Sequence, residues 1–193
     1  MVSTYGDVLR PARREAALFY DVMLVLAGSL LIALTAQVSF NIGPVPITGQ
    51  TFGVLLVAAL LGSKRGGAAV LAYLVEGASG LPFFAGGVGG AAVFAGPTGG
   101  YLVGFLPAAL LVGWLAERGW DRRFALTLVA MILGNLVIYS FGVPYLRSVL
   151  SVSWSDAFAF GLTPFVVGDL FKVVAAAILL PTGWKLLNRT PSP

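Results

Sequence analysis

Long apolar segments, almost free of charge and separated by short basic stretches, make up most of this chain. Ten of its 12 Lys and Arg residues lie at the two ends and in two inter-helix turns: Arg10, Arg13, Arg14, Lys64, Arg65, Arg118, Arg122, Arg123, Lys185 and Arg189. Basic residues in short loops are retained on the cytoplasmic side of a membrane. The pattern therefore predicts a multi-pass protein of the cell (plasma) membrane, with an even number of spans and both termini cytoplasmic.

The composition excludes several classes of protein. Hydrophobic residues make up 58% of the chain and charged residues 10%, which is too apolar for one soluble core. The net charge of +4 arises from basic residues that flank apolar segments, so we expect anionic lipid headgroups and no nucleic acid as partner. Because the chain has no Cys and no His, we expect no metal site and no catalytic residues.

The predicted fold is all-α, a polytopic membrane protein with six transmembrane helices and glycine-rich external loops folded over a ligand pocket. We expect a single membrane domain over 1–193, with a cytoplasmic N-terminal segment at 1–17. Each span needs about 20 apolar residues, or fewer where the helix is packed within protein. The spans are expected at roughly 18–39, 50–63, 66–79, 99–117, 123–142 and 162–187, the second and third forming a tight helical hairpin.

The external connections are expected around 39–50, 80–98 and 142–161, and they contain one basic residue, Arg147. The middle connection is rich in glycine and apolar residues. It lacks the Ser, Glu and Lys that keep a flexible linker in water. We therefore expect these loops to fold back onto the helices and form a lid.

Among the ionisable residues of the predicted spans, three are candidates for function, namely Glu76, Asp169 and Lys172. Charges in hydrocarbon are costly and usually face a bundle interior or a cavity. Asp169 and Lys172 lie one helical turn apart on a common face. A carboxylate there can accept N–H bonds from a cyclic urea or amide, and an ammonium can donate to a carbonyl or carboxylate. The alternative is an internal ion pair that stabilises the bundle; for Glu76 it is an interfacial or loop-anchoring role.

Other polar and aromatic residues are candidates for ligand contact. Asn135 lies in the fifth span, where it either bonds another helix or meets the ligand. Gln50 lies where the first external loop enters the second span. Thr98 and Gly99 open the fourth span, where free N–H groups can bind a polar ligand.

Aromatic and small residues complete the candidate set. Phe84 and Tyr101 can stack on a ligand ring or pack within the lid. Ser29 and Ala33 form a small-xxx-small pair on the first span, and such spacing permits close approach of another helix, including one from another subunit.

Ordered motifs over roughly 20–187 resemble a known family. They are Val45-Pro46-Ile47-Thr48-Gly49-Gln50-Thr51, Gly80-Leu81-Pro82 with Phe84-Ala85-Gly86-Gly87, Gly96-Pro97-Thr98-Gly99-Gly100-Tyr101, and Gly168-Asp169-Leu170-Phe171-Lys172. The chain is similar to the biotin-specific substrate-binding (S) components of energy-coupling factor (ECF) transporters, the BioY family. The resemblance implies capture of biotin from outside, a transmembrane coupling (T) subunit and two ATP-binding cassette ATPases as partners, and no cofactor in this chain, since ATP is used by the partner subunits.

The resemblance also implies roles for particular residues. Asp169 and Lys172 would hold the polar head of biotin. Ser29 and Ala33 replace an alanine pair at the family's contact for the coupling subunit. The glycine-rich loop lacks the basic residue that some members carry, so Lys172 and loop N–H groups are both candidates for the biotin carboxylate.

Two other classes of function remain open from the sequence. A stand-alone secondary transporter would be driven by protons through Glu76 and Asp169, and would carry biotin or a close analogue. An intramembrane enzyme has little support, because no His accompanies any Ser and there is no paired-aspartate motif or metal cluster.

Overall fold

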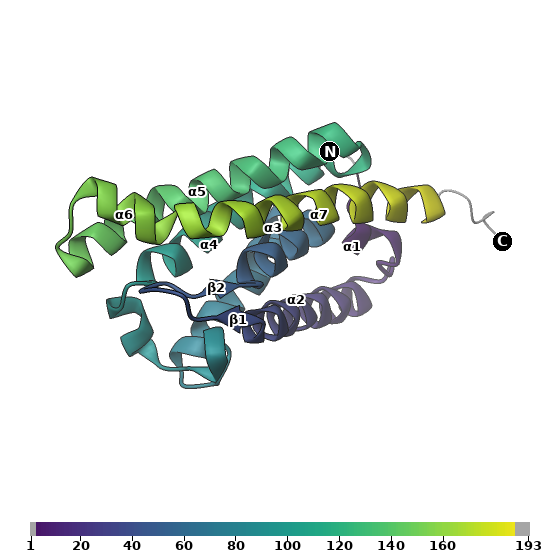
Figure 1. Cartoon of the computed structure of the whole chain (residues 1–193). Coiled ribbons are helices and arrows are strands. Elements are labelled where there is room, and N and C mark those ends of the chain that lie inside the picture. The colour runs from purple at the N-terminus through teal and green to yellow at the C-terminus, as the bar shows by residue number, and fades with distance from the viewer. Residues whose placement is uncertain (1–2, 188–193) are drawn as a thin grey trace.

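The structure is a computed structural model that describes residues 3–187, and its long helices lie side by side in one bundle (Figure 1). The long helices are α2 (Arg14–Gln37), α3 (Gln50–Ala78), α4 (Gly99–Ala116), α5 (Phe124–Leu150) and α7 (Val166–Leu187). Two shorter helices, α1 (Tyr5–Val8) and α6 (Trp154–Gly161), lie at opposite ends of the bundle. The all-α class expected from the sequence is confirmed.

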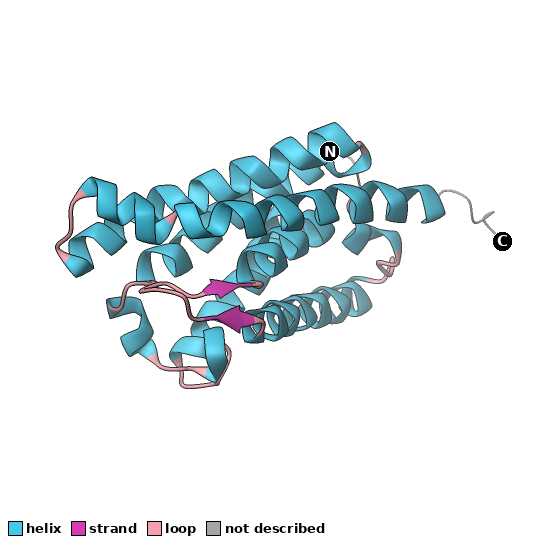
Figure 2. Ribbon diagram, viewed as in Figure 1, coloured by secondary structure: helices cyan, strands magenta, loops and turns pink. Residues whose placement is uncertain are grey.

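The connections contain short elements of their own (Figure 2). Strand β1 (Ser39–Phe40) pairs antiparallel with β2 (Ile47–Thr48), with Ser39 opposite Thr48. Single 3₁₀ turns are η1 (Ala85–Gly87), η2 (Ala91–Ala95), η3 (Trp120–Arg122) and η4 (Thr163–Phe165). Both strands and the first two turns lie at the same end of the bundle as α6.

Within residues 3–187, five helical segments are long and apolar enough to cross a membrane: α2, α3, α4, α5 and the stretch Trp154–Leu187 that contains α6 and α7. Helix α3 is broken at Gly62, whose φ of 81° and ψ of 178° are not helical. Its two halves lie side by side, because Gln50 Nε2 is 2.5 Å from Tyr73 Oη although an unbroken helix would separate them by about 35 Å. The expected hairpin is therefore present, and the count of six spans stays a prediction.

Two helix boundaries differ from the expected ones. Helix α5 continues to Leu150 instead of ending near 142, and α6 occupies part of the expected connection 142–161. The helix continues because Gly142, Val143 and Leu146 are buried, and Gly142 lies directly against the Tyr101 ring of α4. Helix α2 also begins earlier than expected, at Arg14 instead of residue 18.

Small residues form much of the contact between neighbouring helices. Helix α3 packs between α2 and α4, α4 also packs against α5, and α5 packs against α7. Ala58, Ala69, Ala108 and Ala109 are buried in these interfaces. Side chains without a β-branch or long stem let helix backbones approach closely, which favours association in lipid. Other large apolar residues, such as Phe19, Leu34 and Phe171, face outward.

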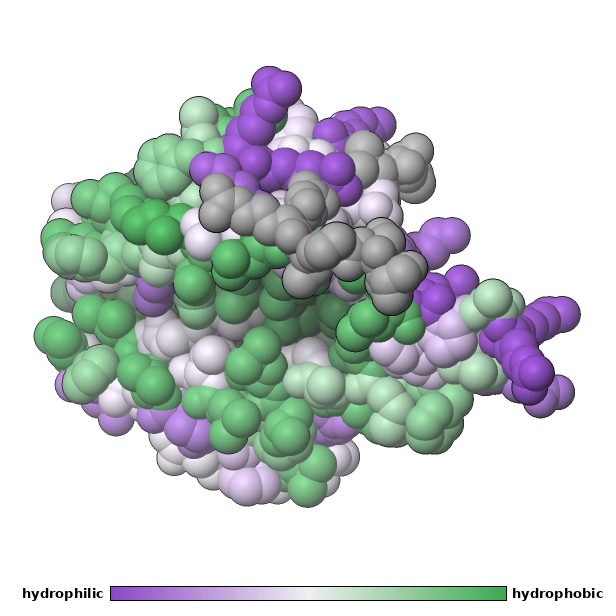
Figure 3. Space-filling model, turned by 90° about the vertical axis from the view of Figure 1, so that its right-hand side faces the viewer, coloured by the Kyte–Doolittle hydropathy of each residue, from purple (hydrophilic) through white to green (hydrophobic). Residues whose placement is uncertain are grey.

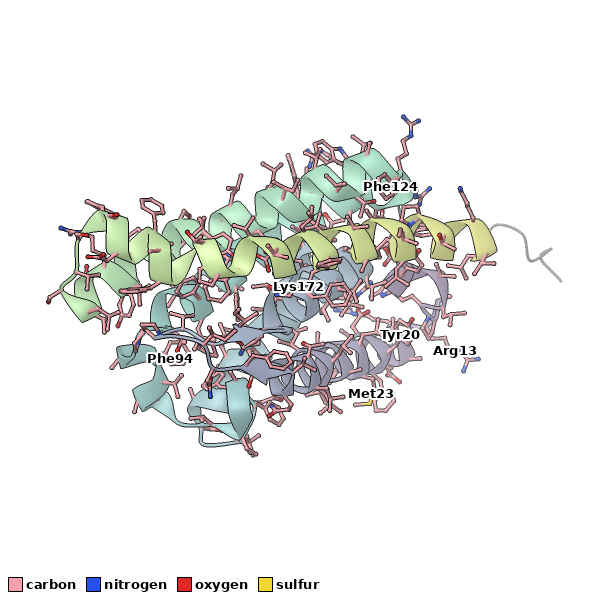
Figure 4. All side chains as sticks on the ribbon, in the orientation of Figure 1. Arg13, Tyr20, Met23, Phe94, Phe124 and Lys172 are labelled. Carbon is pink, nitrogen blue, oxygen red and sulfur yellow. The ribbon has the colours of Figure 1, made fainter. Side chains whose placement is uncertain are left out.

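The basic residues gather at one end of the bundle. Figure 4 places Arg13 and the lid residue Phe94 at opposite ends, with Lys172 between them. Seen end-on, hydrophilic side chains gather along the top and right of the basic end (Figure 3). Arg65 lies 2.8 Å from both Asp7 and Asp21, so it ties α1 and α2 to the turn of α3.

Candidate functional site

An acid/base pair lies buried between α3, α5 and α7. Lys172 Nζ is 2.9 Å from Asp169 Oδ1 and 3.0 Å from Thr51 Oγ1. The Tyr139 hydroxyl donates to Asp169 Oδ2. Asp169 is 7% exposed, so its charge is compensated by protein groups instead of water. The expected ion pair is thus one part of a network that spans three helices.

The start of α7 explains why this carboxylate is placed here. The helix begins at Val166, so Asp169 lies in its first turn, where the helix dipole favours negative charge. Lys172 follows one turn later on the same face. Leu170 and Phe171, on the opposite face, are 62% and 73% exposed to the surroundings of the bundle. This separation turns the charged pair inward and the apolar residues toward lipid.

A cavity of about 40 Å³ lies beside the pair. Its lining mixes hydrogen-bonding groups with apolar and aromatic ones: Val45, Pro46, Thr48, Gln50, Thr51, Thr98, Tyr101, Leu102, Phe105, Tyr139, Phe165 and Lys172. We call it the inner cavity. The polar residues come from β2, the start of α4, and helices α3, α5 and α7. The aromatic rings come from α4, α5 and η4.

An outer cavity of about 150 Å³ adjoins the inner cavity under the glycine-rich loop. The two share four lining residues, Pro46, Gln50, Thr98 and Leu102. The rest of the outer lining is apolar: Phe84, Ala85, Val88 and Val93. The arrangement is an elongated space with a polar inner end and an apolar outer end.

The glycine-rich loop folds onto the helices, as expected. Phe84 is buried, and its ring meets the ring of Tyr73 edge-on at a centroid distance of 5.6 Å. The amide Nε2 of Gln37, at the end of α2, lies 3.0 Å from the Ala33 carbonyl oxygen. The same Nε2 lies 3.4–3.5 Å from the carbonyl oxygens of the loop residues Pro82, Phe83 and Phe84. One side chain thus joins α2 to the loop.

The structure brings most of the predicted ligand-binding residues together. Gln50, Thr98, Tyr101 and Lys172 line the inner cavity, and Phe84 lines the outer one. Asp169 lines neither cavity, but it accepts hydrogen bonds from three inner-cavity residues, Lys172, Tyr139 and Thr51. Contact of these residues with a ligand stays a prediction.

Gly99 has a packing role. Its N–H donates to the Gly96 carbonyl at 3.0 Å, so it is not free for a ligand, contrary to expectation. A Cβ at this position would lie 1.9 Å from the Phe94 carbonyl oxygen, so only glycine allows the loop to approach α4 this closely. The Tyr101 hydroxyl also bonds within the protein, since it donates to the Gly161 carbonyl at 2.8 Å.

Glu76 and the small-residue pair form an interface within the chain. The Ser29 hydroxyl donates to Glu76, which joins α2 to α3, and Glu76 lines neither cavity. Ser29 and Ala33 are only 1% and 4% exposed. In the structure these three residues therefore serve the contact between α2 and α3, and ligand contact by Glu76 and subunit contact by Ser29 and Ala33 stay predictions. These residues pack α2 against α3 because their small size lets the two helices approach closely.

Asn135 lies behind Lys172. It is not among the residues that line the inner cavity, and its contact with a ligand stays a prediction. Its Oδ1 is buried and has no hydrogen-bond partner among residues 3–187. It lines a separate small cavity together with Thr51 and Lys172.

Sequence reasoning missed Thr51, Tyr139, Phe105 and Phe165 as cavity residues. Two of them carried a usable signal: Thr51 follows Gln50, and Tyr139 lies one turn from Asn135 on the same face of α5. The two phenylalanines carried none. In residues 3–187, no group of three or more His, Cys, Asp or Glu could hold a metal ion.

Comparison with known proteins agrees with this geometry. The model of the BioY family matches residues 11–189. The chain belongs to the BioY family. A BioY protein of Rhizobium etli, described as a biotin transporter, is 40% identical over 167 residues, covering 82% of this chain and 89% of the relative. The biotin transporter BioY of Thermotoga maritima is 44% identical over 158 residues, covering 81% and 92%.

A solved structure has the same fold as this BioY chain. It is the crystal structure at 2.1 Å of the S-component for biotin from an ECF-type ABC transporter, with a TM-score of 0.77 over 90% of this chain and 95% of that one. At 24% identity the match shows the fold alone. The resemblance to BioY proteins drawn from the motifs is confirmed. The family is one of transporters, and the chain is not an enzyme.

Proposed function

We propose that this chain is the biotin-binding S component of an ECF-type vitamin uptake transporter. The observation that carries the proposal is the buried Asp169–Lys172 pair beside a cavity under an apolar loop. Relatives of 40% and 44% identity described as biotin transporters support the choice of ligand. The chain would act in the plasma membrane and catalyse no reaction itself.

The shape and polarity of the cavities suit biotin. Its rigid bicyclic head carries a cyclic urea, and an apolar chain leads from the head to a carboxylate. Asp169 has acceptor capacity beyond its bonds from Lys172, Tyr139 and Thr51, because a carboxylate offers about four lone-pair sites. It would accept a urea N–H. Lys172 places a positive charge near the urea oxygen, and the second amide N–H of Gln50 is available to it.

The two cavities would serve different parts of the ligand. The inner cavity would hold the ring head, and the apolar outer cavity would hold the chain and direct the carboxylate toward the loop. At about 40 Å³ the inner cavity is smaller than the bicyclic head, so binding requires the lining side chains and the loop to move apart. The covering loop, with its many glycines, is the segment suited to that movement.

Energy for uptake would come from partner subunits. The chain has no nucleotide-binding loop with the Lys and Ser/Thr spacing that phosphate binding requires. A transmembrane coupling (T) subunit and two ATPases would therefore drive delivery of captured biotin to the cytoplasm.

Isothermal titration of the purified, detergent-solubilised protein with biotin tests the ligand. We expect micromolar or tighter binding, weakened at least about tenfold by Asp169→Asn and by Lys172→Met, since bonds to charged groups are lost. Asp156→Asn is the matched control, because the Asp156 carboxylate accepts a hydrogen bond from Ser153 at the start of α6 and lines neither cavity. No binding by the wild type, or unchanged binding in both site variants, would refute the proposal.

Reconstitution separates the proposed transporter from a stand-alone proton-coupled carrier. We expect liposomes that contain only this chain to show no biotin uptake under a pH gradient, and uptake to begin when the coupling subunit, the ATPases and ATP are added. The position of Glu76 supports this choice, since it bonds Ser29 and lines neither cavity. Uptake by the chain alone would instead identify a secondary transporter.

A further inference from the structure

A small cavity lies behind the acid/base pair, between α3, α5 and α7. Its volume is about 10 Å³, which is the space that one water molecule needs. Its walls are Thr51, Phe52, Leu55, Met131, Asn135, Lys172 and Val173. Three of these residues present hydrogen-bonding groups, and the others are apolar. A buried water requires two to four polar partners, so this cavity meets both conditions.

Two polar groups that line this cavity lack a hydrogen-bond partner, one of them a donor and the other an acceptor. An ammonium group has three N–H donors. Two donors of Lys172 go to Asp169 Oδ1 and Thr51 Oγ1, at 2.9 Å and 3.0 Å. Asn135 lines the same cavity and is 8% exposed, and its Oδ1 is buried without a partner among residues 3–187. One donor and one acceptor therefore remain among the residues that line this cavity.

Leaving both groups unpaired is costly. A buried amide oxygen without a hydrogen bond keeps its desolvation penalty, and an unused N–H of a partly buried cation keeps a larger one. A water molecule that accepts from Lys172 Nζ and donates to Asn135 Oδ1 satisfies both groups, with Thr51 as a further neighbour.

We propose that one ordered water in this cavity joins Lys172 to Asn135, and that Asn135 is thereby a positioning residue for the ligand site. The inference rests on the proposed biotin-binding function. Asn135 would act through the water, without contacting the ligand. The water would accept a hydrogen bond from the third N–H of the Lys172 ammonium group, and Thr51 and Asp169 accept from the other two. The Lys172 ammonium group would then keep one position beside the inner cavity. Its bond to Asp169 would hold that carboxylate in place as well.

Substitutions in this cavity test the role of Asn135. Asn135→Leu keeps the branched shape and removes the acceptor, and we expect it to weaken biotin binding about three- to tenfold in titration. Met131→Leu is the matched control, because it alters the same wall with little change of volume and should leave affinity unchanged. Asn135→Asp keeps an acceptor oxygen and should bind more tightly than Asn135→Leu.

A double-mutant cycle supplies a readout that does not depend on biotin. We expect Asn135→Leu to lower the thermal unfolding midpoint in the wild type but not in a Lys172→Met background, since its partner is then gone. Equal effects of Asn135→Leu in both backgrounds would mean that Asn135 acts independently of Lys172, which would overturn the proposal.

An experimental structure with resolved waters gives the direct test. Density at about 2.7–3.2 Å from both Lys172 Nζ and Asn135 Oδ1 is expected. Density absent from the cavity, or Asn135 bonded directly to another side chain, would overturn the proposal. If the wild type fails to bind biotin, the proposed function falls, while the unfolding cycle and the water density still decide whether Asn135 positions Lys172.

Discussion

At the scale of single residues, Tyr139 offers a prediction. Its hydroxyl donates to Asp169, so Tyr139→Phe should weaken biotin binding about tenfold. The thermal unfolding midpoint should also fall by a few degrees, because the buried carboxylate loses a hydrogen bond. Titration with biotin measures the first effect and a melting curve in detergent the second. Tyr20→Phe, on α2 and outside both cavities, serves as control. Equal affinity of the Tyr139 variant and the wild type would show that the hydroxyl does not support the site.

Charge was the sequence feature that identified residues of the candidate site at this scale. Asp169 and Lys172 stand out in an apolar run, and Gln50 was found from its place at the start of a span. Tyr139 was missed because a tyrosine in an apolar helix is equally suited to the membrane interface. The small-residue spacing of Ser29 and Ala33 does not reveal which helix packs against them, and in the structure Ser29 bonds Glu76 of α3.

Asp121, in η3 at the basic end, makes stability depend on pH. Burial raises its pKa above the usual value, although the Trp184 indole N–H, at 2.5 Å, and nearby Arg122 act in the opposite direction. The folded protein therefore holds this proton more tightly than the unfolded chain. The stabilising contribution is present in full below the unfolded pKa of about 3.9, and it is lost as pH rises through the raised folded value.

The corresponding variant is Asp121→Asn, which keeps an acceptor for Trp184 and removes the titration. We expect the melting temperature of the variant, minus that of the wild type, to increase from pH 4 to pH 7. Other groups titrate in both proteins, so their effects on the melting temperature cancel when the two values are subtracted. A difference that decreases over this range would contradict the assigned burial of the carboxylate.

At the scale of helices, apolar length predicted where helices lie better than where they end. Helix α5 runs past its expected end because Gly142 and Leu146 bury against α4 and α6, a tertiary contact that hydropathy does not report. The turn of α3 was visible, since Gly62 and two charged residues interrupt the apolar run. The lid was predicted from its composition, whereas the packing of Phe84 on Tyr73 had no sequence signal.

Gly62 makes the turn of α3 testable. Its backbone occupies a region that residues with a Cβ rarely adopt, and an added Cβ would lie 2.8 Å from Glu117 Oε1. Gly62→Ala should therefore destabilise the protein by about 1–3 kcal/mol and lower the melting temperature by several degrees. Gly43→Ala is the control, because nothing lies within 4 Å of its added Cβ. Equal melting temperatures would show that the turn tolerates a side chain.

At the scale of the whole molecule, the two ends differ in charge. Arg10, Arg65 and Arg122 gather at the end that holds α1, and the apolar loops cover the other. Tyr5 of α1 donates to the Leu180 carbonyl of α7, so the first and last helices meet at the basic end. This common end was predicted from charge alone, and its position on the cytoplasmic side stays a prediction.

Cysteine labelling determines the sidedness. The chain has no Cys, so single substitutions report one position each. In intact cells, a membrane-impermeant maleimide should label Ser153→Cys at the start of α6, and should label Lys64→Cys in the α3 turn only after permeabilisation. The unsubstituted chain should take no label. The reverse pattern would place the covered cavities toward the cytoplasm and exclude capture from outside.

The Gln37 amide has a mechanical consequence. It bonds its own helix and lies against successive carbonyl groups of the covering loop, so loop and helix end move as one piece unless this junction breaks. Helix α2 also lies at the edge of the bundle and packs mainly on α3. A displacement of α2 would therefore move the glycine-rich loop as well. A partner subunit that binds α2 from the lipid side would then open the two cavities without contacting their ligand.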